Sequence, residues 1–361
     1  PGDVTLSTQV QINSFPIDYN NCKQISGNLT ITGPSDITNL NGLSNLETIT
    51  GQLNIVHNNN LTNLSGLSNL KTVGNNFWIS DNTALTTING FNALQTTGQF
   101  YIGNNTALTT ISFSNALTSI TSFTILNNSL LQSINGFNNI TSINGIVNIE
   151  NNTVLQNFNA FNKLGSVGNH LQFSGNPQLQ NIDSLHKLTT VGGAFNIAQN
   201  GALTNLNGFR KLTTVGGFFQ IWNNTQLVNI DSLYKLTTVG AELIVEDNSQ
   251  LTNISALAGV NPNTIGGTYG LYIVNNTSLS VCNLPNFCTY LANPSNTHPR
   301  TISGNLANCL NEATVVAACS APINEYVNFL GTMFVKKGST GTGSSWSNAI
   351  GELADALVIA K

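Results

Sequence analysis

Charged side chains are scarce in this chain of 361 residues, where Asp, Glu, Lys and Arg together make up only 7 %. An ordinary soluble protein carries about 25 %. The 11 Lys and Arg residues are spread thinly, and the formal net charge is −4. We therefore expect no basic stripe that would neutralise a row of phosphates, which argues against nucleic acid as a partner.

Long apolar runs are also absent, because no stretch of 18 consecutive apolar residues occurs. This excludes a transmembrane helix, and we expect no direct membrane insertion. The chain begins Pro1-Gly2-Asp3-Val4 without Met and carries no signal peptide, which suggests a processed or trimmed start. Hydrophobic residues still make up 40 % of the sequence, which is enough for a core.

Motifs that carry catalysis or bind phosphate are missing as well. Neither G-x-S-x-G nor H-E-x-x-H occurs, and the glycine-rich stretch 338–343 lacks the Gly-Lys-Ser/Thr of a phosphate loop. Asp183 and Asp231 share one repeat position and are predicted to be turn or surface residues. The acidic stretch 242–247 is predicted to be a solvated edge. The histidines share no repeat position: His57, His170, His186 and His298. We expect no enzymatic activity, no metal site and no cofactor.

A unit of 23–24 residues recurs about ten times, with clear copies starting at Gly51, Asn75, Gly193 and Gly217. Each unit holds three short apolar pieces. The first alternates like a half-buried strand, the second reads Leu-x-x-Ile, and the third reads Leu-x-x-Val and ends at a Gly. None is long enough for a helix. The pattern predicts a mainly all-β parallel solenoid, with three short strands or extended sides per coil and a core completed by stacking.

An Asn follows the first apolar piece of every unit. Its positions are Asn58, Asn82, Asn105, Asn128, Asn152, Asn176, Asn200, Asn224, Asn248 and Asn276. Because Asn tolerates left-handed backbone and bonds backbone groups, we predict a corner ladder that runs from coil to coil. A ligand-binding Asn column is the alternative. The Gly that closes a unit is interpreted as a turn glycine: Gly74, Gly98, Gly168, Gly192, Gly216 and Gly240.

Alternation in the first piece assigns a second set of residues to the outward side of its strand. The candidate binding residues there are Trp78, Tyr101, Gln172, Asn196, Phe218, Gln220, Trp222 and Tyr272. Exposed aromatic rings beside amides suit stacking on sugars or anchoring a protein partner. The alternative is that another chain or an adjoining segment covers them.

The consensus pattern hhI-x-x-N-x-x-L-x-x-I-x-G-h-x-x-L-x-T-V-G, in which h is a hydrophobic residue and x any residue, recurs over about residues 26–280. It resembles the receptor L-domain family and its bacterial leucine-rich-repeat-like relatives. The resemblance implies a right-handed β-solenoid, and it implies a binding or scaffolding role without naming a ligand.

The remaining segments also carry resemblances. Residues 1–25 resemble an N-terminal cap, and 281–319 resemble the cysteine-bearing C-terminal cap of secreted bacterial proteins. Residues 320–323 read as a linker. Residues 324–361, a strand followed by a helix, resemble the truncated start of a secreted parallel β-helix domain. A cap is physically required, because a solenoid otherwise exposes an apolar end.

Five cysteines occur, and two disulfides formed in an oxidising compartment are the preferred interpretation of the last four. Proximity in sequence alone favours the pairs Cys282–Cys288 and Cys309–Cys319, and the crossed pairings remain open. Cys22 is either free or paired outside the chain.

The leading functional hypothesis is a non-enzymatic, extracellular, cell-surface-associated module of a bacterial protein. It would be structural or adhesive and would bind a glycan or a surface protein through the outward strand face. The alternative is a self-assembling filament or surface-layer subunit that binds copies of itself, with the C-terminal tail docked on a neighbour. Two minor alternatives are ice binding through the paired threonines around Thr190, Thr214 and Thr238, and the non-catalytic part of a polysaccharide-degrading enzyme.

Overall fold

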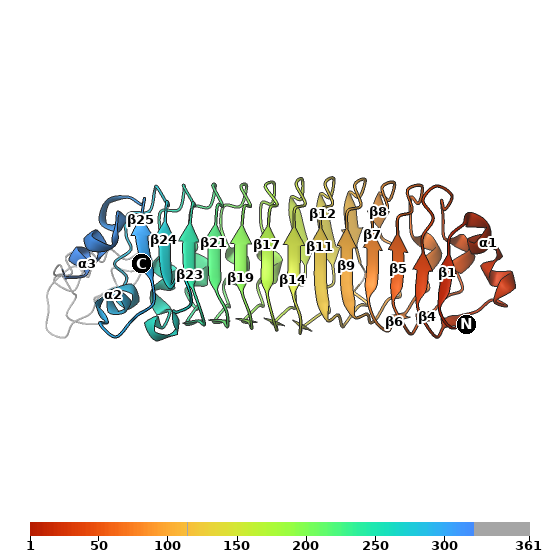
Figure 1. Cartoon of the computed structure of the whole chain (residues 1–361), viewed down its shortest axis with the longest axis horizontal. Helices are drawn as coiled ribbons and strands as arrows, with labels where there is room; N and C mark the ends of the chain where they lie inside the picture. Colours follow the sequence, from red (N-terminus) through yellow and green to blue (C-terminus); the bar gives the residue numbers. More distant parts are fainter. Residues whose placement is uncertain (114, 321–361) are drawn as a thin grey trace, which may run out of the picture.

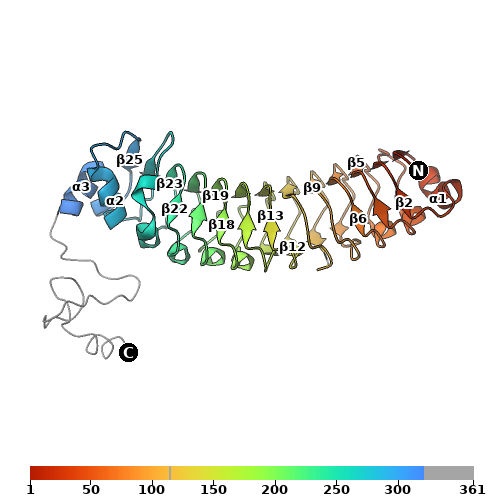
Figure 2. The same cartoon turned by 90° about the horizontal axis from the view of Figure 1, so that it is seen from below.

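The computed structural model describes residues 1–113 and 115–320. Stacked coils form an elongated solenoid, with α1 at one end and α3 at the other (Figures 1 and 2). The predicted all-β parallel solenoid is therefore confirmed. Predictions for residues 321–361 lie outside the described residues.

One sheet runs the length of the solenoid and faces the viewer in Figure 1. It has 13 strands, in the order β1 (Val4–Leu6), β3 (Leu29–Ile31), β5 (Leu53–Val56), β7 (Phe77–Ser80), β9 (Gln99–Gly103), β11 (Ser122–Leu126), β14 (Val147–Glu150), β17 (Leu171–Ser174), β19 (Phe195–Ala198), β21 (Phe219–Trp222), β23 (Leu243–Glu246), β24 (Leu271–Val274) and β25 (Arg300–Ser303). Neighbouring strands are parallel, and each contributes the alternating piece of one coil. The first and last strands fall within the segments predicted as caps.

The Leu-x-x-Val pieces form the second side of the coils as two short parallel sheets. One contains β2 (Gln24–Ile25), β4 (Thr48–Ile49) and β6 (Thr72–Val73); the other contains β13 (Ser142–Ile143), β16 (Ser166–Val167), β18 (Thr190–Val191), β20 (Thr214–Val215) and β22 (Thr238–Val239). Figure 2 shows the second group along the solenoid.

The Leu-x-x-Ile side differs from coil to coil. A sheet forms only in the middle, from β8 (Thr87–Ile88), β10 (Thr110–Ser112), β12 (Ser133–Gly136) and β15 (Asn157–Ala160). Elsewhere this side ends in a 3₁₀ turn: η1 (Asn41–Leu43), η2 (Ser65–Leu67), η3 (Asp183–Leu185), η4 (Asn207–Phe209), η5 (Asp231–Leu233) and η6 (Ser255–Gly259). In these coils a local bond, such as that from the Leu67 amide to the Leu64 carbonyl, stabilises the chain in place of a longer strand ladder.

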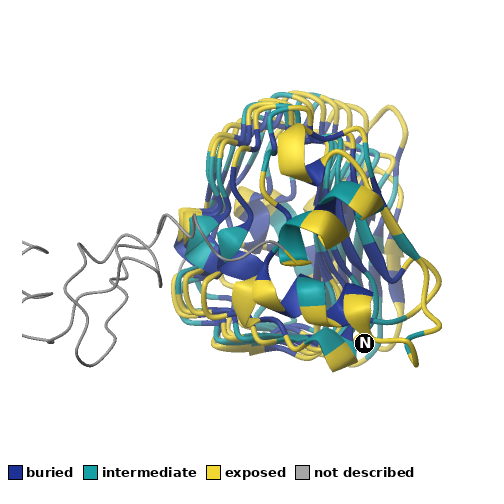
Figure 3. Cartoon of the chain, turned by 90° about the vertical axis from the view of Figure 1, so that its left-hand side faces the viewer, coloured by how far each residue is buried: buried dark blue, intermediate teal, exposed yellow. Residues whose placement is uncertain are grey.

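The inward side chains form columns that fill the interior, and Figure 3 shows buried residues lining the inside of the coils. Phe77, Phe100 and Phe123 stack along one column with ring centroids 4.9 and 5.1 Å apart. A single coil cannot bury these rings, so the core exists only through stacking.

The glycines that close each unit have a different role from the one predicted. A Cβ on Gly192 would lie 2.2 Å from the Gly168 carbonyl oxygen, and one on Gly240 would lie 2.1 Å from that of Gly216. Neither glycine has positive φ. They are required because adjacent coils approach closely at this corner, and not because of a turn conformation.

Additional elements cover both ends. At the N-terminal end, α1 (Gln9–Asp18) packs on η1 and buries Ile12 and Phe15. Its first turn has a capping box between Thr8 and Gln11. At the C-terminal end lie α2 (Pro285–Ala292), η7 (Pro262–Thr264), η8 (Ala307–Cys309) and α3 (Glu312–Ser320). Ser320, the first residue of the predicted linker, ends α3.

The predicted disulfide pairing is wrong, because the bonds join Cys282 to Cys309 and Cys288 to Cys319. Their sequence separations are 27 and 31 residues, and the Cα atoms lie 5.1 and 5.6 Å apart. Stacking brings together residues about one coil apart in sequence, and this outweighs proximity along the chain.

Candidate binding face

The outward side of the 13-stranded sheet gathers the predicted binding residues, and we call it the outer face. Strand register places six of them in one column, namely Trp78, Tyr101, Gln172, Asn196, Gln220 and Tyr272. Phe218 precedes β21, and Trp222 ends it. All eight side chains are half-buried, since each packs against its neighbours on adjacent strands.

Trp78 and Tyr101 form a pair of stacked rings on β7 and β9. Their centroids are 3.8 Å apart and their planes differ by 16°. The Trp78 indole donates a hydrogen bond to Ser80 Oγ at 3.0 Å, and the Tyr101 ring lies against Gly103, where a Cβ would clash with it. Because the rings face each other along the solenoid axis, they point their edges outward. Each ring covers one face of the other, so a sugar cannot enter between them.

A second aromatic group lies near the C-terminal end of the same face. We call it the Trp222 cluster; its members are Trp222, Glu246, Asp247, Tyr269 and Tyr272. The Trp222 indole donates to Asp247 Oδ2 at 3.2 Å, and the Tyr272 hydroxyl lies 3.5 Å from Glu246 Oε1. Tyr269, which is 54 % exposed, packs edge-on against Tyr272 at 5.8 Å. Sequence alternation missed Tyr269, because this residue precedes β24 in an irregular loop.

Two groups of the Trp222 cluster have pKa values above their ordinary ones. Burial, together with the negative charge of Asp247, raises the pKa of the Glu246 carboxyl. Burial and the neighbouring carboxylates also raise the pKa of the Tyr272 hydroxyl. The cluster therefore presents aromatic surface beside hydrogen-bond acceptors.

Amides occupy the column between the two aromatic groups. Asn148 precedes Gln172, Asn196 and Gln220 in register. Within residues 1–113 and 115–320, the Oδ1 atoms of Asn148 and Asn196 are buried and have no hydrogen-bond donor. These side chains are half-buried, so a bound molecule would contact the amides through their exposed atoms and not through these two oxygens.

The predicted corner asparagines form a continuous buried row. In a typical step, the backbone N–H of Asn152 donates to Asn176 Oδ1 at 3.1 Å. Its Nδ2 lies 3.1 Å from the Ile125 carbonyl and 3.0 Å from the Glu150 carbonyl. All ten side chains are fully buried, so a soluble ligand has no access to them.

Two details of the ladder differ from the prediction. Left-handed backbone belongs to the residue before each ladder Asn, for example Asn151 with φ 56° and Gln199 with φ 56°. The ladder also has an eleventh member, since Asn276 N–H donates to Asn305 Oδ1 at 2.8 Å. The longer last coil hid Asn305 from the repeat alignment.

The other candidates from the sequence have local roles. The hydroxyls of Thr189, Thr213 and Thr237 each donate to a backbone carbonyl of the preceding coil. In the described ranges, no group of three or more His, Cys, Asp or Glu side chains is placed to hold a metal ion. No helix in those ranges is long and apolar enough to cross a membrane.

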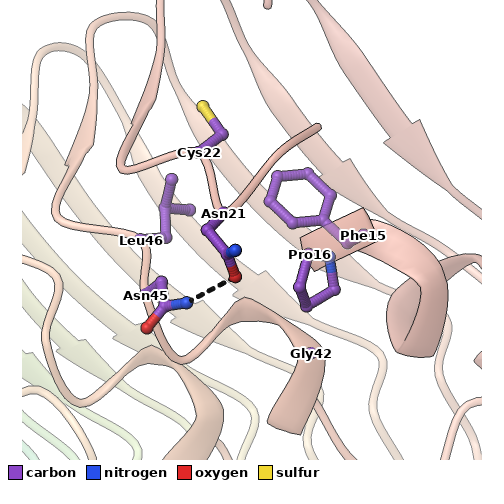
Figure 4. A pocket seen from close by; sticks show the side chains of 7 residues that line it. All are labelled: Phe15, Pro16, Asn21, Cys22, Gly42, Asn45 and Leu46. Atoms are coloured by element: carbon purple, nitrogen blue, oxygen red, sulfur yellow. Dashed lines mark hydrogen bonds between the residues drawn. The ribbon is translucent and has the colours of Figure 1, made fainter. Parts of the chain in front are cut away.

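Cys22 carries a free thiol, which lies 2.7 Å from the Gln24 carbonyl. It lines a small pocket with Phe15, Pro16 and other residues of the N-terminal end (Figure 4). A hydrogen bond of 3.2 Å from Asn45 to Asn21 closes one wall. The pocket has no room for a water molecule, so it offers no ligand site.

Comparison with known proteins supports the repeat assignment. Residues 21–135 match the Receptor L domain family, and the resemblance predicted from the repeat is confirmed there. A solved leucine-rich repeat protein from Bacteroides ovatus ATCC 8483 is similar at 14 % identity, with 71 % of this chain and 72 % of that chain covered and a TM-score of 0.25. No curated protein matches. Residues 21–135 are thus similar to a Receptor L domain, and the described chain is a repeat module of stacked coils.

Proposed function

We propose that this chain is a non-enzymatic extracellular binding module whose outer face holds a glycan or an extended segment of a surface protein. The observation that carries the proposal is the register, which aligns Trp78, Tyr101, Gln172, Asn196, Gln220 and Tyr272 in one column. A ligand lying along the solenoid axis contacts aromatic rings at both ends and amides between them.

The dimensions fit an elongated ligand. From β7 to β21 the sheet advances six strands, which is about 29 Å at roughly 4.8 Å per strand. Trp222 and Tyr272 provide aromatic surface beside carboxylate acceptors, a combination suited to sugar hydroxyls and apolar sugar faces. The two disulfides support an oxidising, extracellular location.

A glycan array probed with the purified chain tests this proposal. We expect Trp222→Ala to weaken binding of any neutral glycan retained by the wild type by about tenfold or more, as for loss of an aromatic anchor. Tyr234→Ala is the matched control, because Tyr234 is 50 % exposed but belongs to another side of the coil. Equal binding of every retained neutral glycan by the wild type and Trp222→Ala contradicts a role of the Trp222 cluster in binding.

A second candidate function is end-to-end assembly, and a separate observation favours it. α1 and α3 lie at opposite ends of the described chain (Figure 1). Val10 and Ile17 on α1 are 73 % and 82 % exposed, and Leu306 and Leu310 near α3 are 52 % and 49 % exposed. Light scattering tests this candidate. If the chains assemble end to end, particle size should grow with concentration, and the double variant Val10→Ser with Ile17→Ser should abolish this growth. In a separate test, equal monodispersity with and without residues 322–361 excludes docking of the tail.

A further inference from the structure

Stacking gathers basic side chains that are far apart in the sequence. Lys163, Lys187, Lys211 and Lys235 are spaced by 24 residues, and each lies three residues before a strand residue, namely Ser166, Thr190, Thr214 and Thr238. Those strand residues pair in parallel register from β16 to β22. The four lysines therefore occupy one position in four successive coils, about 4.8 Å apart. We call these four residues with Arg210 the basic row.

The basic row corrects the expectation that the chain has no basic stripe. Residues 151–241 contain five basic residues, all in the row, and only two acidic ones, Asp183 and Asp231. The chain as a whole has a net charge of −4. The sequence concealed the row because one coil step in space corresponds to 24 residues in sequence.

The side chains of the basic row are exposed and have no ion partner in the described part of the chain. Ion pairs there join Lys23 and Lys71 to Glu47, and Arg300 to Glu312. Lys163 Nζ instead donates to Asn139 Oδ1 at 2.8 Å. Lys235 Nζ lies 5.6 Å from the centre of the Tyr234 ring. Like charges at this spacing repel one another, and a bound polyanion relieves that repulsion.

We propose that the basic row binds a linear polysaccharide that carries one carboxylate on each sugar, lying parallel to the solenoid axis. Its repeat of about 4.8 Å is comparable to the length of one sugar ring with its linking oxygen. Lys ammonium groups bind carboxylates as point charges, and the exposed Asn162 provides an amide beside them for sugar hydroxyls. Duplex DNA fits less well, because its phosphates follow two helical strands.

This site is separate from the outer face. The basic row precedes the second-side strands β16 to β22, whereas Trp222 belongs to the 13-stranded sheet. The result of a binding test on the basic row is therefore independent of the proposed function of the outer face. We expect Trp222→Ala to bind an acidic polysaccharide as the wild type does.

Calorimetric titration with polygalacturonate tests the proposal on the full chain. We expect binding at 50 mM NaCl that weakens at least about tenfold at 200 mM, because several contacts are electrostatic. Lys187→Gln with Lys211→Gln should weaken it about tenfold at the lower salt. Lys23→Gln with Lys71→Gln removes the same charge elsewhere and should leave binding within about twofold.

Further titrations test whether the basic row recognises the carboxylates of the polysaccharide. Fully methyl-esterified polygalacturonate should not bind, and Asp183→Asn with Asp231→Asn should tighten binding of the acid form about twofold. Circular dichroism of each variant verifies folding. Absence of binding to polygalacturonate, equal binding of the esterified polymer, or wild-type affinity in the Lys187/Lys211 double variant overturns the proposal. Tighter binding of inorganic polyphosphate or duplex DNA than of polygalacturonate overturns the assignment to a polysaccharide.

Discussion

At the scale of single residues, the buried amides of the Asn ladder connect the coils. Asn152, a typical member, bonds backbone carbonyls of its own coil and of the preceding coil, and its Oδ1 accepts from the preceding ladder residue, Asn128. Their full burial means that water cannot replace a lost partner. The ladder is therefore where a single substitution should affect stability most.

We expect Asn152→Ala to lower the free energy of unfolding by roughly 2–4 kcal/mol, because it leaves buried carbonyls and N–H groups unpaired. Chemical denaturation measures the change. Asn162→Ala, at an exposed position, should stay within about 0.5 kcal/mol of the wild type. A loss below that size in Asn152→Ala contradicts the structural role of the ladder.

The Asp231 carboxyl makes the stability of the fold depend on pH. Burial raises the pKa of this carboxyl, so the folded state holds the proton to a higher pH than the unfolded state does. Stability therefore falls as pH rises from the unfolded pKa through the folded pKa, and the loss is complete at neutral pH. We expect Asp231→Asn to be more stable than the wild type at pH 7 and to lose this advantage near pH 3. Thermal melts across this range measure it, and an advantage that grows on acidification contradicts the assigned sign.

At the scale of elements, the C-terminal end depends on cross-links between successive layers. Cys282 and Cys309 are fully buried, and Cys288–Cys319 joins α2 to α3. The bonds close loops with sequence separations of 27 and 31 residues. Each therefore restricts the unfolded chain across about one coil.

We expect Cys288→Ala with Cys319→Ala to lower the free energy of unfolding by about 3–4 kcal/mol, from the loop-closure entropy of such a separation. Peptide mapping without reduction should recover Cys282 linked to Cys309 in this variant. Recovery of Cys282 linked to Cys288 from the wild-type chain contradicts the pairing.

At the scale of the whole molecule, stacking covers the apolar core along the solenoid but leaves it open at the first and last coils. Both ends therefore need a covering element. Removing residues 1–22 deletes β1 and α1 and exposes the inward side of the first remaining coil, including Leu29 and Leu43. We expect the truncated chain to aggregate at concentrations where the full chain does not, as measured by light scattering. Replacing Val10 and Ile17 with Ser is the control, because it keeps the cover and removes only its exposed apolar groups. A truncated chain that stays monodisperse contradicts a covering role for α1.

The sequence by itself determined the repeat, the inward columns, the outward column with Trp78 and Tyr101, and the ladder position of Asn152. These follow from periodicity, since a spacing of two residues defines the faces of a strand and a spacing of 23–24 defines the coil. The tertiary structure alone decided how residues one coil apart meet: Cys282 with Cys309, the ring faces of Trp78 and Tyr101, the contact of Gly192 with the Gly168 carbonyl, and the basic row. The physical reason is that stacking turns 24 residues of chain into about 4.8 Å, so neighbours in space are remote in sequence.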